Sequence, residues 1–343
     1  MRFRSLHARF CALLCAPIAA VTAAQAVSPH FQFPTANKAL LTQGGEPSFY
    51  VGTAGKPWTS GQFGCVRSEG HQMHEGLDIR CLRRDANGEP NDPVNASLDG
   101  TVVYISSKPG LSNYGNYIIL SHSVEGVELY TLYAHLREAR PGLRVGQKVR
   151  AGENIATMGR TSNTRQRITQ DRAHVHFEIN LLMNPRFDEW NKRDNPGQRN
   201  DHGMWNGLNL VGIDPAAVFK AQAAQGKNFS ILDQIRNQTE LCRVLVRNPK
   251  FSWVKRYTPL IRRNPQTERD GIAGFEVALN FNGVPYQLTP RSAAELQGRP
   301  DLQVLSVNAA EAAAHGCRHL VQKVGAGWDL TAKGRKHFAL LTY

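Results

Sequence analysis

Short apolar runs separated by turn residues fill the sequence from about residue 63 to residue 182. Pairs such as Asp99-Gly100 and Glu125-Gly126 stand between these runs and favour tight turns. Many short strands at close spacing, with no long amphipathic helical pattern among them, are typical of an antiparallel sheet, sandwich or barrel. The pattern predicts strands over residues 101–105, 117–120, 129–133, 155–158 and 176–181.

The last third of the chain has a different pattern. Apolar residues between 230 and 246 recur at helical spacing, so we expect a helix there. Asn282-Gly283 lies between two apolar runs and is a strong hairpin signal. A second helical pattern covers residues 309–315. Residues 228–343 are therefore expected to form a small α+β domain.

These patterns divide the 343 residues into two expected domains. A mainly β domain covers residues 63–224, after a polar lead-in segment at 27–62, and the α+β domain follows at 228–343. Residues 184–212 are expected to be an irregular insertion, rich in Asn, Arg, Asp, Trp and Gly. Long loops of this kind often have a functional role.

Residues 1–26 have the pattern of a secretory signal peptide. A basic start without acids precedes a mostly apolar run, and Ala24-Gln25-Ala26 is a small-x-small cleavage site. The apolar run is short and broken by Pro17, which argues against a membrane anchor. We expect cleavage after Ala26, no transmembrane segment after signal removal, and a periplasmic or secreted protein.

Composition and charge narrow the class of partner. Hydrophobic residues make up 41% of the chain and charged residues 20%, a balance that excludes a disordered chain. The formal net charge is +13, and removal of the three signal-segment arginines leaves +10. This charge favours anionic partners, although a solvated basic surface explains it equally well. Because we expect export, wall polymer or anionic lipid is a better candidate than nucleic acid, which is not expected.

Four cysteines remain after signal removal, namely Cys65, Cys81, Cys242 and Cys317. An even number in an exported chain predicts disulfides, and four cysteines allow three connectivities. We favour the pairs Cys65–Cys81 and Cys242–Cys317, because each bridge then stays inside its own domain. Zinc ligation by cysteine is the weaker alternative, because no pair has C-x-x-C spacing.

Histidines and carboxylates occur in three motifs within roughly 100 residues. The motifs are far enough apart to lie on separate strands or loops of one domain. They are His74-Glu75-Gly76-Leu77-Asp78, Tyr133-Ala134-His135-Leu136 and His174-Val175-His176. Imidazole and carboxylate groups bind zinc and transfer protons. The third motif lies in an alternating strand pattern that puts both of its histidines on one face, although surface histidines explain that motif alone equally well.

Glu75 does not fit a general-base role. The pair His74-Glu75 resembles the start of the H-E-x-x-H zinc motif, but Asp78 holds the place of the second histidine. Gly76 also disfavours the helix on which that motif depends. A loop that leads into a strand, with Leu77 and Ile79 pointing inward, fits this segment better.

Together the three motifs resemble the M23 peptidase family, the lysostaphin-like zinc endopeptidases of bacterial cell walls. The family pattern H-x3-D, Y-x-H-L and H-x-H appears here as His74…Asp78, Tyr133…Leu136 and His174…His176. The resemblance covers about residues 61–220, and it extends to Pro93–Ala96, Tyr114–Tyr117 and Asp214-Pro215. It departs from the family at Ser162, in the basic stretch 165–172 and in the insertion 184–212, which all bear on substrate choice.

The resemblance implies a mainly β fold with an antiparallel M23 peptidase sheet and one zinc ion per chain. His74, Asp78 and His176 would be the zinc ligands, and His135 and His174 the two unligated catalytic histidines. Three protein ligands leave zinc an open position, as a catalytic site requires, with zinc-bound water as the nucleophile. Which histidine acts as the base stays open.

The resemblance also implies an exported endopeptidase that hydrolyses peptide cross-links of bacterial peptidoglycan, with other peptide substrates as a possibility. The alternative is a catalytically inactive, wall-binding or regulatory M23-like module that activates another wall hydrolase. Such relatives usually lack one or more ligands. All five key residues are present here, which favours the active enzyme.

Overall fold

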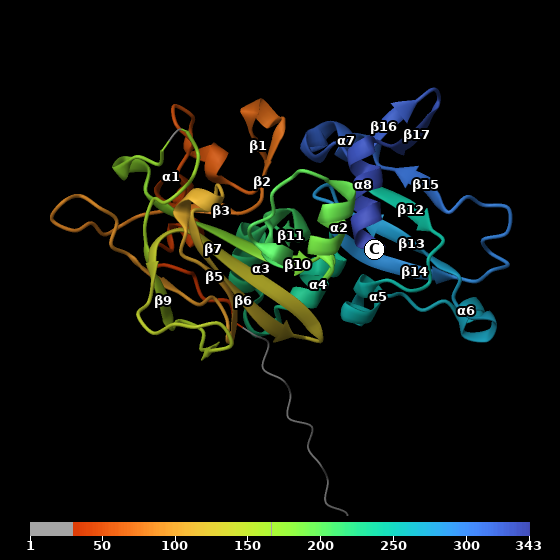
Figure 1. Cartoon of the computed structure of the whole chain (residues 1–343), viewed down its shortest axis with the longest axis horizontal. Helices are drawn as coiled ribbons and strands as arrows, with labels where there is room; N and C mark the ends of the chain where they lie inside the picture. Colours follow the sequence, from red (N-terminus) through yellow and green to blue (C-terminus); the bar gives the residue numbers. More distant parts are fainter. Residues whose placement is uncertain (1–29, 166) are drawn as a thin grey trace, which may run out of the picture.

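The computed structural model describes residues 30–165 and 167–343, and the predicted signal peptide lies outside the described residues (Figure 1). A nine-stranded antiparallel sheet fills the first part of the described chain. Its strands are β3 (Leu77–Arg80), β4 (Pro93–Asn95), β5 (Gly100–Ser106), β6 (Asn116–Val124), β7 (Val127–Ala139), β8 (Lys148–Val149), β9 (Asn154–Met158), β10 (His174–Leu182) and β11 (Leu210–Ile213). The main path runs β11-β10-β7-β6-β5-β8, with β3 paired to β10 and β9 paired to β4 and β7.

The five predicted strands are confirmed, each inside a longer strand of this sheet. β10 is buried along its whole length, because β7, β3 and β11 all pair with it. Its apolar face contributes Val175, Phe177 and Ile179 to the core. Its opposite face carries the two histidines of the third motif, and both are buried. The strand therefore holds polar side chains in a site shielded from solvent.

The lead-in segment packs closely against the large sheet. It contains α1 (Glu46–Phe49), and Phe31, Phe49 and Tyr50 are buried in the same hydrophobic cluster as the sheet residues. A two-stranded hairpin follows, made of β1 (Gly64–Arg67) and β2 (Gln72–His74). The first candidate motif thus begins at the end of this hairpin.

The segment 184–212 is less irregular than its composition predicts, because it contains α2 (Phe187–Asp194). Phe187 and Trp190 are buried and anchor this helix to the core. The short helix α3 (Pro215–Gln225) follows β11, and the Asp214 side chain caps its first turn by accepting from the Ala216 N–H.

The C-terminal part is an α+β unit, as predicted. Its antiparallel sheet has the order β14-β13-β12-β15, and a small hairpin pairs β16 with β17. The strands are β12 (Cys242–Val246), β13 (Gly274–Leu279), β14 (Pro285–Arg291), β15 (Leu302–Val307), β16 (Val321–Val324) and β17 (Gly327–Leu330). The helices are α4 (Ile231–Arg236), α5 (Ser252–Arg256), α6 (Pro265–Asp270), α7 (Ala309–Ala314) and α8 (Ala332–Leu341).

The helix predicted over residues 230–246 is wrong in its second half. It ends at Arg236, and the later residues form β12. β12 pairs with β13 on one side and β15 on the other, so Val244 and Val246 are buried between neighbours. Tertiary pairing of β-branched residues outweighs the local helical spacing here.

The disulfide pairing that we favoured from the sequence is wrong. Cys65 is bonded to Cys317, across 252 residues, and Cys81 and Cys242 are free and buried. The hairpin β1–β2 lies against the turn Gly316–Arg318, which brings these two cysteines together. The Cys81 thiol faces the core instead, where its Sγ donates to Asp92 Oδ2 over 3.0 Å. The bridge therefore joins the two predicted domains.

The two sheets share one hydrophobic cluster as well as this bridge. Three of the buried hydrogen bonds between them are these: Tyr257 Oη accepts from the Leu182 N–H, Leu340 O from Asn184 Nδ2, and Gly212 O from Asn282 Nδ2, each over 2.8 Å. The helices are short: α3 has 11 residues and α8 has 10. Within the described ranges no helix is long and apolar enough to cross a membrane.

Candidate active site

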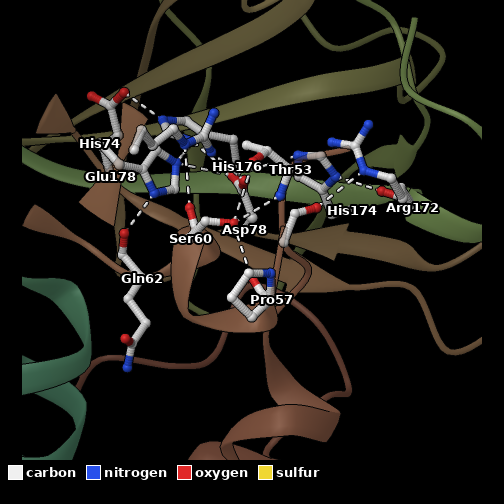
Figure 2. A network of polar contacts seen from close by, with 12 residues as sticks. Thr53, Pro57, Ser60, Gln62, His74, Asp78, Arg172, His174, His176 and Glu178 are labelled. Carbon is white, nitrogen blue, oxygen red and sulfur yellow. Dashed lines mark hydrogen bonds and ion pairs between the residues drawn. The ribbon is translucent and has the colours of Figure 1, made fainter. Parts of the chain in front are cut away.

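Three strands bring His74, Asp78 and His176 to one point, as Figure 2 shows. His74 ends β2, Asp78 lies on β3, and the register between β3 and β10 places His176 directly opposite Asp78. His74 Nε2 lies 3.1 Å from Asp78 Oδ1 and 3.0 Å from His176 Nδ1, and the third side of the triangle is 3.1 Å.

Gly76 makes this approach of the strands possible. A Cβ at this position would lie 2.3 Å from the Phe177 carbonyl oxygen and 2.9 Å from Glu178 Cγ. Only glycine therefore lets the turn between β2 and β3 lie flat against β10. Gly76 thus allows His74 and Asp78, on either side of it, to lie close to β10.

The donor set fits a zinc ion. Each of the three side chains is at most 5% exposed, and two imidazole nitrogens face one another beside a carboxylate oxygen. Two unprotonated nitrogens this close need a cation or a proton between them. Tetrahedral zinc with ligands at about 2.0–2.1 Å has ligand–ligand distances of roughly 3.3 Å. The observed triangle is close to that size.

Hydrogen bonds on the far side of each ring set which nitrogen faces the centre. His74 Nδ1–H donates to the Gln62 carbonyl oxygen over 2.7 Å. His176 Nε2–H donates to Glu178 Oε1, also over 2.7 Å. His74 Nε2 and His176 Nδ1 are thereby left as lone-pair donors, the arrangement that metal-ligating histidines commonly show.

Glu178 belongs to the site, although the sequence interpretation gave it no role. It is 1% exposed, and its carboxylate also accepts from Tyr114 Oη over 2.6 Å and from Asn180 Nδ2 over 2.7 Å. Burial alone would raise the pKa of Glu178, but the bonds from His176, Tyr114 and Asn180 hold it below its usual value. Its place on the polar face of β10 was the available signal.

Arg67 supports Asp78 from the other side. Its guanidinium contacts Asp78 Oδ2, and its Nε donates to the Ser60 carbonyl oxygen over 3.2 Å. Burial opposes ionisation of Asp78, but its contacts with the neighbouring histidine rings and with the Arg67 guanidinium keep its pKa well below the usual range. Asp78 is therefore held as a carboxylate. Ser60 belongs to the lead-in segment, which thus helps to position the site.

His135 and His174 lie beside this triangle, with ring centres 4.8 Å apart. His135 Nδ1–H donates to the Thr161 carbonyl oxygen over 2.9 Å, and His174 Nδ1–H to that of Arg172 over 2.6 Å. Each ring therefore keeps an unprotonated Nε2, and that of His174 lies 3.4 Å from Asp78 Oδ1. Burial lowers the pKa of both histidines, so both are neutral at pH 7.

The backbone at His135 is held in an unusual conformation. Its φ of 60° is rare for a residue with a side chain, and such strain often occurs at functional sites. The neighbouring Gly115 comes so close to Thr161 that a Cβ would lie 2.3 Å from its carbonyl oxygen. These contacts fix the His135 ring.

Glu75 lies on the turn between the two ligand strands but outside the triangle. Its Oε1 is 3.3 Å from Arg318 Nη2 of the C-terminal part. The structure thus brings together all five predicted site residues and places Glu75 in a contact between the two sheets.

Comparison with known proteins identifies the region that holds the site. Residues 72–188 match the model of peptidase family M23. A "Lipoprotein NlpD/LppB homolog" of Pseudomonas aeruginosa is 36% identical over 33% of this chain and 31% of its own. The "Lipoprotein NlpD" of Yersinia enterocolitica is 34% identical over 28% of this chain and 84% of its own. The "Murein hydrolase activator NlpD" of Escherichia coli is 36% identical over 31% of this chain and 22% of its own.

The matching segment spans about a third of the first of these relatives and most of the Yersinia protein. The segment matched by the family model, residues 72–188, contains the whole ligand triangle and both neighbouring histidines. With the family model and a relative matched over most of its length, the chain belongs to peptidase family M23.

Proposed function

We propose that this protein is a zinc-dependent endopeptidase that hydrolyses peptide cross-links of bacterial peptidoglycan. The observation that carries the proposal is the convergence of five side chains, four of them buried and His135 half-buried, with the tautomers that catalysis needs. His74, Asp78 and His176 form the triangle, and His135 and His174 present unprotonated Nε2 atoms beside it. All five residues of the family pattern are present, which favours an active enzyme over a non-catalytic relative.

His74, Asp78 and His176 would hold the zinc ion. When bound, zinc supplies Lewis acidity, which activates water as the nucleophile and polarises the scissile carbonyl. Glu178 keeps His176 in the tautomer that offers Nδ1, and Arg67 fixes the second carboxylate oxygen of Asp78. Glu178 is buried, and Arg67 is also held by the Ser60 carbonyl oxygen, so both partners are already in place for the site.

His135 and His174 would move the protons of the reaction. Peptide hydrolysis must take a proton from water and deliver one to the departing amine. Both rings are neutral at pH 7, and each has one acceptor nitrogen because its Nδ1–H is bound to a carbonyl. Their ring centres lie 4.8 Å apart, so both rings could reach the same peptide bond at the triangle.

Peptidoglycan is proposed as the substrate from the relatives and from the sequence. The Escherichia coli relative is named for murein, and the basic chain with its signal-like start suits export to an anionic wall. A periplasmic or secreted location follows from the same features.

Activation of another wall hydrolase is the second candidate, and the name of the Escherichia coli relative favours it. In that case the protein would bind wall and a partner enzyme without cleaving peptide. Its buried ligand triangle would then have a structural role only.

Zinc-loaded protein incubated with purified wall separates the two candidates. We expect new amino groups in proportion to enzyme, and a loss of at least about 100-fold in His135→Ala and His174→Ala, which lack a proton-transfer group. Both variants should keep one zinc per chain. Wild-type protein that binds zinc yet releases no amines, while it stimulates a second hydrolase, would establish the activator instead.

A further inference from the structure

A second recess lies between the large sheet, α2 and the C-terminal helix α8. It has a volume of about 770 Å³, within the range of ligand-binding clefts. Its walls include Tyr114 and Glu75 from the region of the metal site, Trp190 from α2, and Arg318, Lys333 and Lys336 from the C-terminal part. We call this recess the interdomain cleft.

The interdomain cleft carries an excess of positive charge. Four cations line it, together with two carboxylates, and both carboxylates already pair with arginines. Arg199 Nε lies 2.7 Å from Asp201 Oδ1, and Arg318 Nη2 lies 3.3 Å from Glu75 Oε1. The lysines remain uncompensated: the only contact of Lys336 Nζ with a side-chain oxygen in the described residues is to the neutral amide of Asn195.

One face of α8 presents these lysines to the cleft. Four residues of α8 line the recess: Lys333, and at three, four and seven residues after it Lys336, His337 and Leu340. This spacing puts them on one side of the helix. The two ammonium groups are therefore neighbours on one helix face. Two carboxylates a few bonds apart on a peptide could contact both at once.

The opposite wall offers a donor without a partner. Trp190 is 4% exposed, and its Nε1–H has no hydrogen-bond acceptor among the described residues. Leaving such a buried donor unsatisfied is costly. Its ring lies 5.9 Å from Lys336 Nζ, which places the donor and the cation at the same part of the cleft.

The interdomain cleft adjoins the metal site through Tyr114. The Tyr114 hydroxyl bonds Glu178, the partner of His176, and its ring centre is 5.6 Å from that of His176. Met73 and Glu75, on either side of the ligand His74, also line the cleft. A peptide bound across the triangle could therefore continue into this recess.

We propose that the interdomain cleft is a substrate subsite that binds the free carboxylates of an acidic peptide through Lys333 and Lys336. The inference rests on the proposed peptidase function and extends it. It assigns part of the choice of substrate to the C-terminal unit, and the disulfide Cys65–Cys317 and the pair Glu75–Arg318 hold that unit beside the site.

The test compares one soluble wall peptide that carries free carboxylates with the same peptide after amidation of those groups. Cleavage is followed as kcat/KM with zinc-loaded wild-type chain. Binding is measured by calorimetry with the zinc-loaded His174→Ala chain, so that the peptide is not cleaved. If the wild-type chain itself proves inactive, binding is measured with the wild type. Lys333→Ala/Lys336→Ala is the test variant, Lys333→Arg/Lys336→Arg keeps the charge, and Lys323→Ala removes an exposed lysine outside the cleft.

We expect the free-carboxylate peptide to bind the unsubstituted cleft about tenfold more tightly than the amidated one, as charge-assisted hydrogen bonds allow. The double alanine variant should lose this preference and leave binding of the amidated peptide unchanged. The arginine pair and Lys323→Ala should keep the preference. Equal binding of the two peptides, or a preference that survives the double alanine change, overturns the proposal. A preference in binding without any cleavage would uphold the subsite and refute the peptidase function.

Discussion

Glu178 shows how one buried side chain can decide the chemistry of its neighbours. Its carboxylate accepts hydrogen bonds from His176, Tyr114 and Asn180, and the residue is buried. Its negative charge orients the His176 ring and makes Nδ1 a better electron-pair donor. The residue would therefore act on the proposed zinc centre without belonging to the triangle of His74, Asp78 and His176.

Glu178→Gln should weaken zinc binding by about 10- to 100-fold, because the amide keeps the shape but loses the charge that orients His176. Competition with a chelator of known affinity measures the change. Glu189→Gln, an exposed carboxylate on α2 paired with Arg186, is the matched control and should leave zinc affinity unchanged. Unaltered affinity in Glu178→Gln would contradict the role that we give to the carboxylate.

The turn between β2 and β3 sets the geometry at the scale of elements. It must lie against β10 so closely that no Cβ fits at Gly76, because two ligands flank it and the third is on β10. A change at this glycine should therefore move the ligands together rather than one at a time.

Gly76→Ala should lower the zinc content and reduce the free energy of unfolding by about 1–3 kcal/mol, the usual cost of forcing extra volume into a packed site. Metal analysis and urea titration measure the two effects. Gly110→Ala is the control, since a Cβ there would meet no atom within 4 Å. Normal zinc binding in Gly76→Ala would show that the turn can shift without cost.

Helix α8 carries a half-buried histidine that should make stability depend on pH. His337 Nε2–H donates to the Gly283 carbonyl oxygen over 2.8 Å, and burial lowers the pKa of His337 from 6.5 to about 4. The unfolded chain binds this proton more readily, so stability is complete above about pH 6.5 and falls as the pH drops toward 4.

Each pH unit in that window should cost up to about 1.4 kcal/mol from this residue. His337→Gln should therefore show a shallower decline in the free energy of unfolding between pH 6.5 and 4.5 than the wild type, measured by urea titration at several pH values. The ligand histidines are common to both proteins and cancel in the comparison. His71→Gln, at an exposed position, should keep the wild-type slope, and an equal slope in His337→Gln would refute the assignment.

At the scale of the whole molecule, the two sheets behave as one body. They share a hydrophobic cluster, three buried backbone–side-chain hydrogen bonds and a disulfide that spans most of the sequence. We therefore expect one cooperative unfolding transition rather than two.

Cys317→Ser should lower the free energy of unfolding by about 2–5 kcal/mol, because the unfolded chain gains the freedom of a very long loop. Calorimetry of the full chain measures this change and shows whether one transition remains. Reductant should destabilise the wild type by a similar amount and leave Cys317→Ser unaffected. Equal stability of variant and wild type without reductant would argue against the bridge.

The sequence by itself determined five strands of the large sheet and the candidate residues of its site. Strands such as 129–133 follow from alternation and turn residues, which are local properties. His74, Asp78, His135, His174 and His176 were visible because metal binding restricts which residue types occur at which spacing. The double histidine on one face of β10 likewise follows from the two-residue period of a strand.

Tertiary structure alone decided which distant segments meet. Residues 242–246 form a strand because two partners pair with them, and Cys65 bonds Cys317 because the hairpin β1–β2 lies against the turn at 316–318. The role of Glu178 and the lysine-lined cleft arise in the same way. Such contacts depend on packing between residues far apart in sequence, which local periodicity does not encode.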